Sequence, residues 1–240
     1  MIGALIGEYY FNRFENNGRI DFRKNIHGSI ELSDSLRNYN GVMEIISKRG
    51  CFDSRLVQKT LQKPNKISDN TGYFAVSCIP LAWAMTNLKE IYEAINSFKE
   101  SLNISEEEWI LSLLTTRLIF ECINQKTKRQ CLLITYNFIE NMKVGKFGKV
   151  CDLNKCIKTL LKFFQIMNTF LFSKDFEDCV KNSLINEFAT SEFCSLISAI
   201  AEAYYLSINQ KIIKNFKQAA PKDFVKTLDA FTATVAHWLI

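Results

Sequence analysis

The sequence predicts an all-α protein that folds as one compact domain of about ten to twelve helices. In segment after segment, apolar residues lie three and four positions apart, which is the spacing of one helix face. The 240 residues include only three prolines and nine glycines, so few positions interrupt a helix and no linker divides the chain. The sequence shows neither an alternating strand pair nor an internal repeat. We therefore expect residues 1–240 to form a single domain.

Charge and hydropathy exclude several classes of function. The 30 Lys and Arg residues exceed the 25 Asp and Glu residues by five, but these cations are scattered and no aromatic ladder accompanies them. We expect solvated helix faces and no nucleic-acid partner. No apolar run reaches the roughly 18 residues of a membrane span. The apolar start lacks a basic leader, and Glu8 interrupts it too early for a signal peptide. We expect a cytoplasmic protein with no membrane partner.

The eight cysteines include no CxxC pair, and the chain has only two histidines, so the sequence does not predict a zinc site. Most of the cysteines lie inside apolar helical patterns. We expect buried, reduced thiols and no disulfides.

The first helix is predicted over residues 1–14, where Gly3 and Gly7 would allow another helix to approach closely. A polar loop with His27 at the surface follows. The next helix begins near Ser33 and Asp34, because a hydroxyl and an acid before an apolar helical pattern favour a helix start. Further helices are predicted over 51–63, 76–85, 87–99, 106–123, 127–142 and 153–167.

Four further predictions concern the later helices. Ser105 and Glu108 have the spacing of a capping box for the helix over 106–123. The four phenylalanines at 163, 164, 170 and 172 are predicted to lie in the core. Another helix follows Asn209, and Pro221 begins a last one whose apolar stripe ends at Trp238.

A buried central helix is predicted from about residue 190 to Tyr204. Its large apolar residues share one face, and its alanines keep the rest thin enough for close neighbours. Thr190 and Ser191 precede it with hydroxyl oxygens that can accept the unpaired N–H groups of a helix start. The residues of the apolar face are Phe193, Leu196, Ile197, Ile200 and Tyr204, and the alanines are Ala199, Ala201 and Ala203.

Several of these segments resemble the ADP-ribosylglycohydrolase family, the dinitrogenase reductase-activating glycohydrolase-like proteins. The opening GALIGEYYFNRFE is similar to the family's GAIIGDxxGSRFE, with Glu8 in place of Asp. The segments SKDFEDCVKNSL and SAIAEAYY resemble the helices on either side of the family's GGDxDT turn. The resemblance implies an orthogonal helical fold of the ADP-ribosylglycohydrolase type. It also implies cleavage of the bond between ADP-ribose and a protein side chain with the help of two magnesium ions.

The resemblance carries over to a set of cleft residues. Glu15 matches a family glutamate near the substrate. The stretch from Ser33 to Ser35 falls on the family's Thr-Asp-Asp-Thr turn, although a plain helix N-cap explains these residues equally well. Gly72 falls on the family's NGSxMR segment, as does Asn70 in an alignment with one gap. The expected cleft residues are Glu15, Ser33, Asp34, Ser35, Asn70, Gly72, Thr190, Ser191 and Glu192, with Glu15 and Asp34 as catalytic candidates.

The chain departs from the family at its metal-binding positions. Ala189 and Ser191 stand where the family's GGDxDT turn has aspartates, and neither histidine of the family's THxHP motif is present. Asp34 and Glu192 remain as weak metal candidates, and the dipole at a helix start also explains Glu192. Two magnesium ions would then face roughly two carboxylates instead of four. We therefore expect no metal or other cofactor.

Three functions are compatible with this sequence. The first is a pseudoenzyme that keeps the family's fold and binds an ADP-ribose-like ligand, an ADP-ribosylated protein or another protein partner. The second is an active hydrolase that removes ADP-ribose from protein side chains, with a site rebuilt around Glu15, Asp34 and Glu192 and with magnesium as its cofactor. The third is a helical interaction module of the immunity or effector type. The missing acids and histidines favour the first and third.

Overall fold

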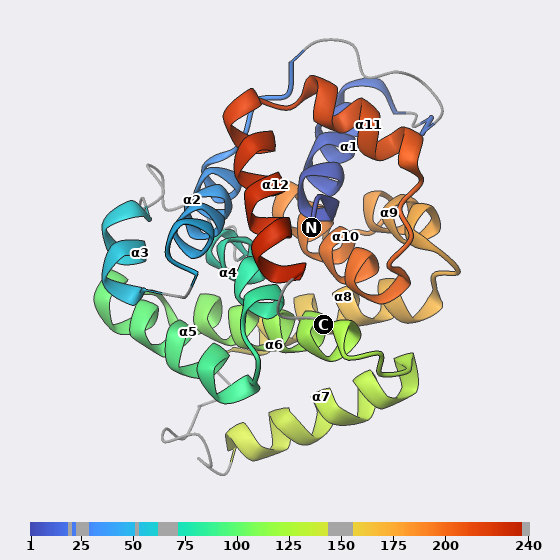
Figure 1. The fold of residues 1–240 in the computed structure, drawn as a ribbon. Helices are drawn as coiled ribbons and strands as arrows, with labels where there is room; N and C mark the ends of the chain where they lie inside the picture. The colour runs from blue at the N-terminus through green and yellow to red at the C-terminus, as the bar shows by residue number, and fades with distance from the viewer. Residues whose placement is uncertain (19–20, 23–28, 51–52, 62–71, 144–155, 237–240) are drawn as a thin grey trace.

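The computed structural model describes residues 1–18, 21–22, 29–50, 53–61, 72–143 and 156–236. Within these ranges the chain forms twelve α-helices and no strand, which confirms the predicted all-α class (Figure 1). The helices are α1 (Gly3–Asn17), α2 (Asp34–Arg49), α3 (Ser54–Thr60), α4 (Tyr73–Ala84), α5 (Leu88–Leu102), α6 (Glu106–Ile123), α7 (Lys128–Lys143), α8 (Ile157–Phe172), α9 (Phe176–Leu184), α10 (Ser191–Tyr205), α11 (Gln210–Ala219) and α12 (Lys222–Ala236).

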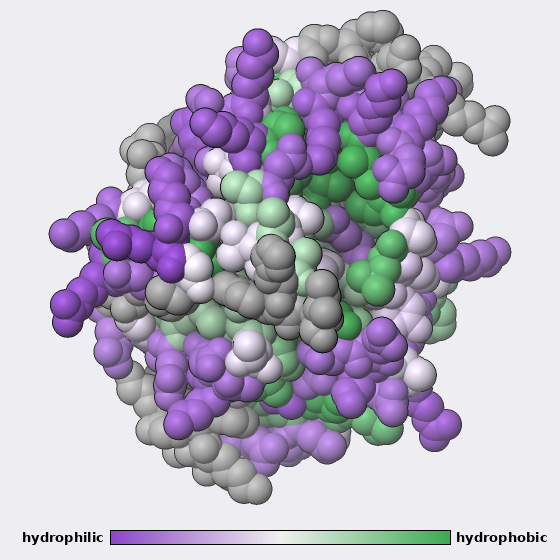
Figure 2. Space-filling view, in the orientation of Figure 1, coloured by the Kyte–Doolittle hydropathy of each residue, from purple (hydrophilic) through white to green (hydrophobic). Residues whose placement is uncertain are grey.

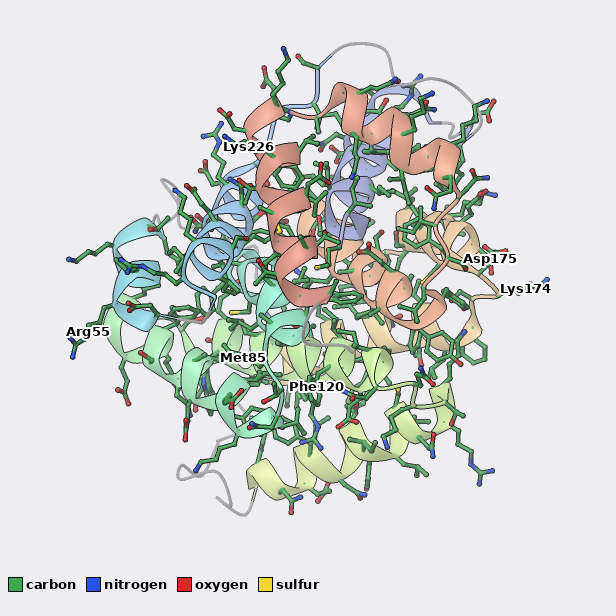
Figure 3. All side chains as sticks on the ribbon, in the orientation of Figure 1. Arg55, Met85, Phe120, Lys174, Asp175 and Lys226 are labelled. Carbon is green, nitrogen blue, oxygen red and sulfur yellow. The ribbon has the colours of Figure 1, made fainter. Side chains whose placement is uncertain are left out.

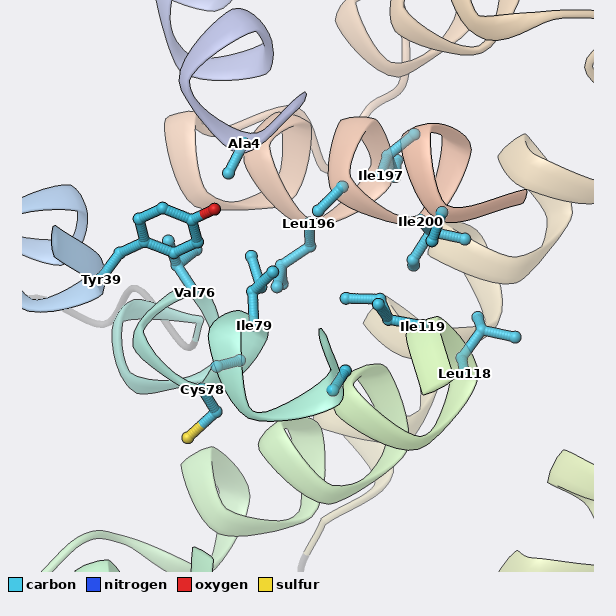
Figure 4. Close-up of a cluster of buried hydrophobic side chains, with 14 of the residues drawn as sticks. Ala4, Tyr39, Val76, Cys78, Ile79, Leu118, Ile119, Leu196, Ile197 and Ile200 are labelled. Atoms are coloured by element: carbon cyan, nitrogen blue, oxygen red, sulfur yellow. The ribbon is translucent and has the colours of Figure 1, made fainter. Parts of the chain in front are cut away.

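Helix α10 lies at the centre of the fold and contacts α1, α4, α6, α8 and α9. Leu196, Ile197 and Ile200 are completely buried, and the alanines on the other faces are buried as well. Figure 4 shows Leu196 next to Ile79 of α4, and Ile200 facing Ile119 of α6. The prediction of a buried central helix is confirmed.

Helices α1 and α10 pack closely because α1 has two glycines on the contact face. A Cβ atom at Gly3 would overlap the carbonyl oxygen of Ser198, and one at Gly7 would overlap the carbonyl oxygen of Cys194. These contacts confirm the close helix approach predicted from the two glycines.

Two of the predicted helix starts are observed in the structure. Each is set by a short polar side chain that bonds to a nearby backbone N–H group. The Oγ atom of Ser105 accepts the Glu108 N–H at 3.2 Å, and α6 has the predicted bounds. The Oγ1 atom of Thr190 accepts the Phe193 N–H at 3.1 Å at the start of α10. Both predicted caps are confirmed.

Other predictions need correction. Phe163 and Phe170 are buried, but Phe164 is 38% exposed and Phe172 is 81% exposed, so assigning all four phenylalanines to the core was wrong. Helix α4 begins at Tyr73, three residues before its predicted start at residue 76. Helix α3 is shorter than the predicted helix over 51–63. His27, Cys51, Asn70, Cys151 and Trp238 lie outside the described residues.

The molecular surface carries most of the charge. Arg55 of α3, Lys226 of α12 and Lys174, between α8 and α9, are exposed and point away from the body of the protein (Figure 3). Hydrophilic residues cover most of the face in Figure 2, and hydrophobic residues show between them near α11 and α12. None of the helices in the described ranges has the length and apolar character needed to cross a bilayer.

Candidate functional site

Three helix starts meet around four charged residues, of which Glu8 and Lys162 are buried and Glu108 and Glu192 are half-buried. Helices α2, α4 and α10 begin there, and α1, α6 and α8 contribute one charged side chain each. We call Glu8, Glu108, Lys162 and Glu192 the buried charge cluster. Glu192 and Lys162 both lie close to Gly72. A Cβ atom added at Gly72 would lie 3.1 Å from the Glu192 Cβ and 3.6 Å from the Lys162 Nζ.

Glu8 binds the start of α2. Its Oε2 accepts the Ser33 hydroxyl proton at 2.6 Å, and its Oε1 accepts the Ser33 backbone N–H at 3.1 Å. Because Ser33 gives its only hydroxyl proton to Glu8, Ser35 donates in the 2.8 Å contact between the two hydroxyls. Ser33 also accepts the Leu36 N–H as the N-cap of α2. Glu8, Ser33 and Ser35 therefore form one hydrogen-bonded chain.

Glu8 is only 2% exposed. Burial raises the pKa of its carboxyl to about 7, the two hydrogen bonds from Ser33 oppose that shift, and the negative charge of Glu192 adds to it. Glu8 therefore changes its charge near neutral pH.

Glu108 caps the start of α4 from the first turn of α6. Its carboxylate accepts the backbone N–H of Gly72, and the Phe74 N–H donates to its second oxygen at 3.0 Å. Gly72 has φ +131°, a conformation that side chains disfavour. Burial raises the pKa of Glu108, while these backbone N–H groups and Lys162 lower it. The capping box predicted from spacing is thus only half formed, because the Glu108 side chain reaches another helix.

Lys162 brings an ammonium group into this cluster from α8, and the residue is 8% exposed. Burial lowers its pKa, and the charges of Glu192 and Glu108 raise it. Oε2 of Glu192 is buried and accepts no hydrogen bond from the described residues. The ammonium therefore compensates carboxylates that are partly removed from water.

Asp34, Asn38 and Tyr73 lie at the edge of the cluster. Asn38 donates its Nδ2–H to the Tyr73 hydroxyl at 2.9 Å. Burial raises the pKa of Tyr73 to about 12, the Asp34 charge raises it further, and the Asn38 hydrogen bond opposes the shift. Asp34 also pairs with Arg37 at 3.2 Å, and its side chain is 37% exposed. Asp34 therefore stands between the cluster and solvent.

The structure brings most of the predicted cleft residues together. Glu192 belongs to the cluster, Ser33 and Gly72 contact it, Ser35 reaches it through Ser33, and Asp34 lies at its edge. Thr190 and Ser191 form the start of α10, where Thr190 acts as a cap and the Ser191 carbonyl accepts from Ser195. Glu15 is exposed, two turns or roughly 10 Å along α1 from Glu8, so it lies apart.

Sequence reasoning did not identify Glu8, Glu108 or Lys162 as site residues. Glu8 lies on the apolar face of the first helix, and Lys162 interrupts the apolar run from Leu160 to Phe164. Glu8 and Lys162 could have been identified as charged residues on helix faces that are predicted to be buried. A buried charge needs a partner, so such a residue is a candidate for a site. Local spacing gives no such signal for Glu108.

The residues present do not fit the magnesium pair of the hydrolase alternative. Glu8 uses its oxygens for Ser33 and Glu108 uses its oxygens for the α4 backbone, while Lys162 already supplies a positive charge. In the described ranges, no group of three or more His, Cys, Asp and Glu side chains is arranged to hold a metal ion. Asp34 and Glu192 come from two different helix starts, those of α2 and α10.

Comparison with known proteins gives no further assignment. Neither the search of protein-family models nor the search of curated proteins found a match to this chain.

Proposed function

We propose that this protein is an ADP-ribosylglycohydrolase-like binding protein that does not use the di-magnesium hydrolysis of that family. The observation that supports this proposal most strongly is the ammonium of Lys162 beside Glu108 and Glu192. A lysine at this place neutralises the carboxylates without a metal. The sequence resemblance supplies the fold type, in which the same helix starts surround the reaction centre.

The edge of the cluster suits a sugar with several hydroxyl groups. The Asp34 carboxylate accepts hydrogen bonds, and the Tyr73 hydroxyl, which accepts one from Asn38, is also a donor. A ribose needs such a mixture of donors and acceptors. We therefore propose an ADP-ribose-like ligand whose ribose lies next to Asp34.

Thermal unfolding of the full chain with ADP-ribose, with magnesium and then with a chelator, tests this function. At a ligand concentration about a hundred times the Kd, we expect the Tm to rise by roughly 5 to 10 °C, equally in both conditions. Asp34→Ala should remove the shift. Glu44→Ala, a change at a more distant, half-exposed acid of the same helix that pairs with Lys48, should keep it.

Two outcomes contradict the proposal. A shift that appears only with magnesium would indicate a metal-dependent site. Release of ADP-ribose from a modified arginine or serine peptide would favour the rebuilt hydrolase, with Asp34 and Glu192 as its remaining acids.

A second candidate, a protein-interaction module, is favoured by the apolar side chains that remain exposed. Leu133 and Tyr136 on α7 are 55% and 59% exposed, and Leu161 on α8 is 53% exposed. Exposed apolar residues of this size are common in protein interfaces. An unchanged Tm with ADP-ribose in both conditions would leave this candidate as the better one.

A further inference from the structure

Two buried cysteines face each other across the turn between α6 and α7. Cys122 lies in the last turn of α6, and Cys131 lies in the first turn of α7. Their Sγ atoms are 4.0 Å apart, and the residues are 1% and 0% exposed. The intervening turn is tight, with Gln125 at φ +58°. Both thiols are reduced in this structure.

We propose that Cys122 and Cys131 form an intramolecular disulfide when the protein reacts with a peroxide. A disulfide requires a sulfur–sulfur distance of about 2.05 Å, so the two sulfurs must move closer by roughly 2 Å. Among the described helices, α7 packs chiefly against α6. A small shift of its first turn therefore disturbs few other contacts.

The main restraint on that turn is a flexible side chain. Lys128 Nζ donates to the carbonyl oxygens of Leu171 and Ser173 at 3.2 and 2.5 Å and to the Tyr205 hydroxyl at 2.8 Å. Its four-carbon chain can keep these bonds while the backbone of α7 moves. The Lys128 contacts are therefore compatible with the closing of the disulfide.

The contact between the two sulfurs favours a thiolate at Cys131 over one at Cys122. A hydrogen bond from Cys122 lowers the pKa of Cys131 against the effect of burial, and the same interaction raises the pKa of Cys122, with burial adding to it. Thiolates are the nucleophilic form. By contrast, burial raises the pKa of Cys179 and of Cys194 to about 12, so these two thiols are poor competitors.

The reaction balances with hydrogen peroxide as the oxidant. The Cys131 thiolate attacks one peroxide oxygen, the O–O bond breaks, and the departing hydroxide takes up a proton to become water. Cys131 is then a sulfenic acid. The Cys122 sulfur attacks the Cys131 sulfur, the S–O bond breaks, and the departing hydroxide leaves as water with the Cys122 proton. Two thiols are oxidised by two electrons, and one peroxide is reduced to two waters.

Peptide mapping tests the proposal on the full chain. The reduced protein is treated with hydrogen peroxide, its remaining thiols are alkylated, and its peptides are identified by mass spectrometry without reduction. We expect a cross-linked peptide pair that contains Cys122 and Cys131, with a mass lower by two hydrogen atoms. Cys122→Ala and Cys131→Ala should each abolish the pair, whereas the matched buried control Cys179→Ala should retain it.

Hydrogen exchange provides a second measurement. The disulfide ties α7 to α6, so amide exchange in α7 should become roughly tenfold slower after oxidation, and a thiol reductant should restore the original rate. The wild-type peptide map decides the question even if a variant does not fold. Intact thiols at both positions after peroxide treatment would overturn the proposal, as would a sulfinic acid at Cys131 without a cross-link or a cross-link between other cysteines.

Discussion

The Glu108 carboxylate accepts the backbone N–H of Phe74 at 3.0 Å, so a residue in the first turn of α6 caps the first turn of α4. Residues 34 positions apart in the chain are joined by this bond, and the Gly72 N–H donates to the same carboxylate. Two helix starts are thereby fixed against each other at the edge of the buried charge cluster.

Removal of this cap should destabilise the protein. Glu108→Ala leaves two buried N–H groups without an acceptor, and we expect it to lower the free energy of unfolding by about 2 kcal/mol. Urea denaturation measures the effect. Glu107→Ala, at the neighbouring residue of the same first turn, should change stability by less than about 0.5 kcal/mol. If both changes lower the free energy of unfolding equally, the hydrogen bonds between Glu108 and the start of α4 do not contribute to stability as expected.

Glu8 should make stability depend on pH. Its pKa is raised from 4.5 to about 7 in the folded state. Between these values the folded state binds more protons than the unfolded state, so the stability from Glu8 is complete below pH 4.5 and is lost as the pH rises to 7. The loss should be about 3 kcal/mol.

Glu8→Gln isolates this contribution. The variant keeps the size of the side chain and an acceptor oxygen for Ser33, but it does not titrate. We expect the variant to be the more stable protein at pH 8 and the difference to shrink as the pH falls to 5. A difference that stays constant over this range would contradict the raised pKa. Chemical denaturation at a series of pH values gives the result.

Loss of the buried ammonium should be costly at neutral pH. Lys162→Met leaves Glu108 and Glu192 without their compensating charge, and we expect a loss of about 3 kcal/mol in unfolding free energy. The double variant Lys162→Met/Glu192→Gln should recover at least about 1 kcal/mol of this loss. Lys158→Met, at an exposed position one turn earlier in α8, serves as the control. Additive effects of the Lys162 and Glu192 changes would mean that the two charges do not interact.

The contact between α1 and α10 should tolerate no side chain at Gly7. Gly7→Ala forces a methyl group against the Cys194 carbonyl, and we expect a loss of about 3 kcal/mol. Thermal unfolding measures this loss. Asn12→Ala, at an exposed position of the same helix, should have little effect. A stable Gly7→Ala variant would show that the two helices can separate at low cost.

Features that depend on neighbouring residues could be predicted from the sequence, whereas features that depend on contacts between distant segments could not. Ser105 and Thr190 cap their helices with hydroxyls that bond to an N–H three residues away, so spacing alone identifies them. Gly3 and Gly7 predict that another helix packs closely against α1, but the sequence does not indicate that this helix is α10. Phe172 shows the limit of periodicity, because an apolar helix does not reveal which of its faces stays uncovered.

In the candidate site, too, residues at helix starts could be predicted from the sequence, and contacts between distant segments could not. Ser33 and Glu192 could be selected because they lie at helix starts that the sequence marks. The partners of Glu8 and Glu108 come from distant segments of the chain and are fixed only by tertiary packing. The compensating charge of Lys162 is likewise a property of the folded protein.

Calorimetric titration of the full chain with magnesium tests most directly whether Lys162, and not a metal, neutralises the cluster. We expect no saturable heat of binding at micromolar magnesium. Saturable binding in that range, lost in Asp34→Ala or Glu192→Gln, would show that the site holds a metal and would contradict the account.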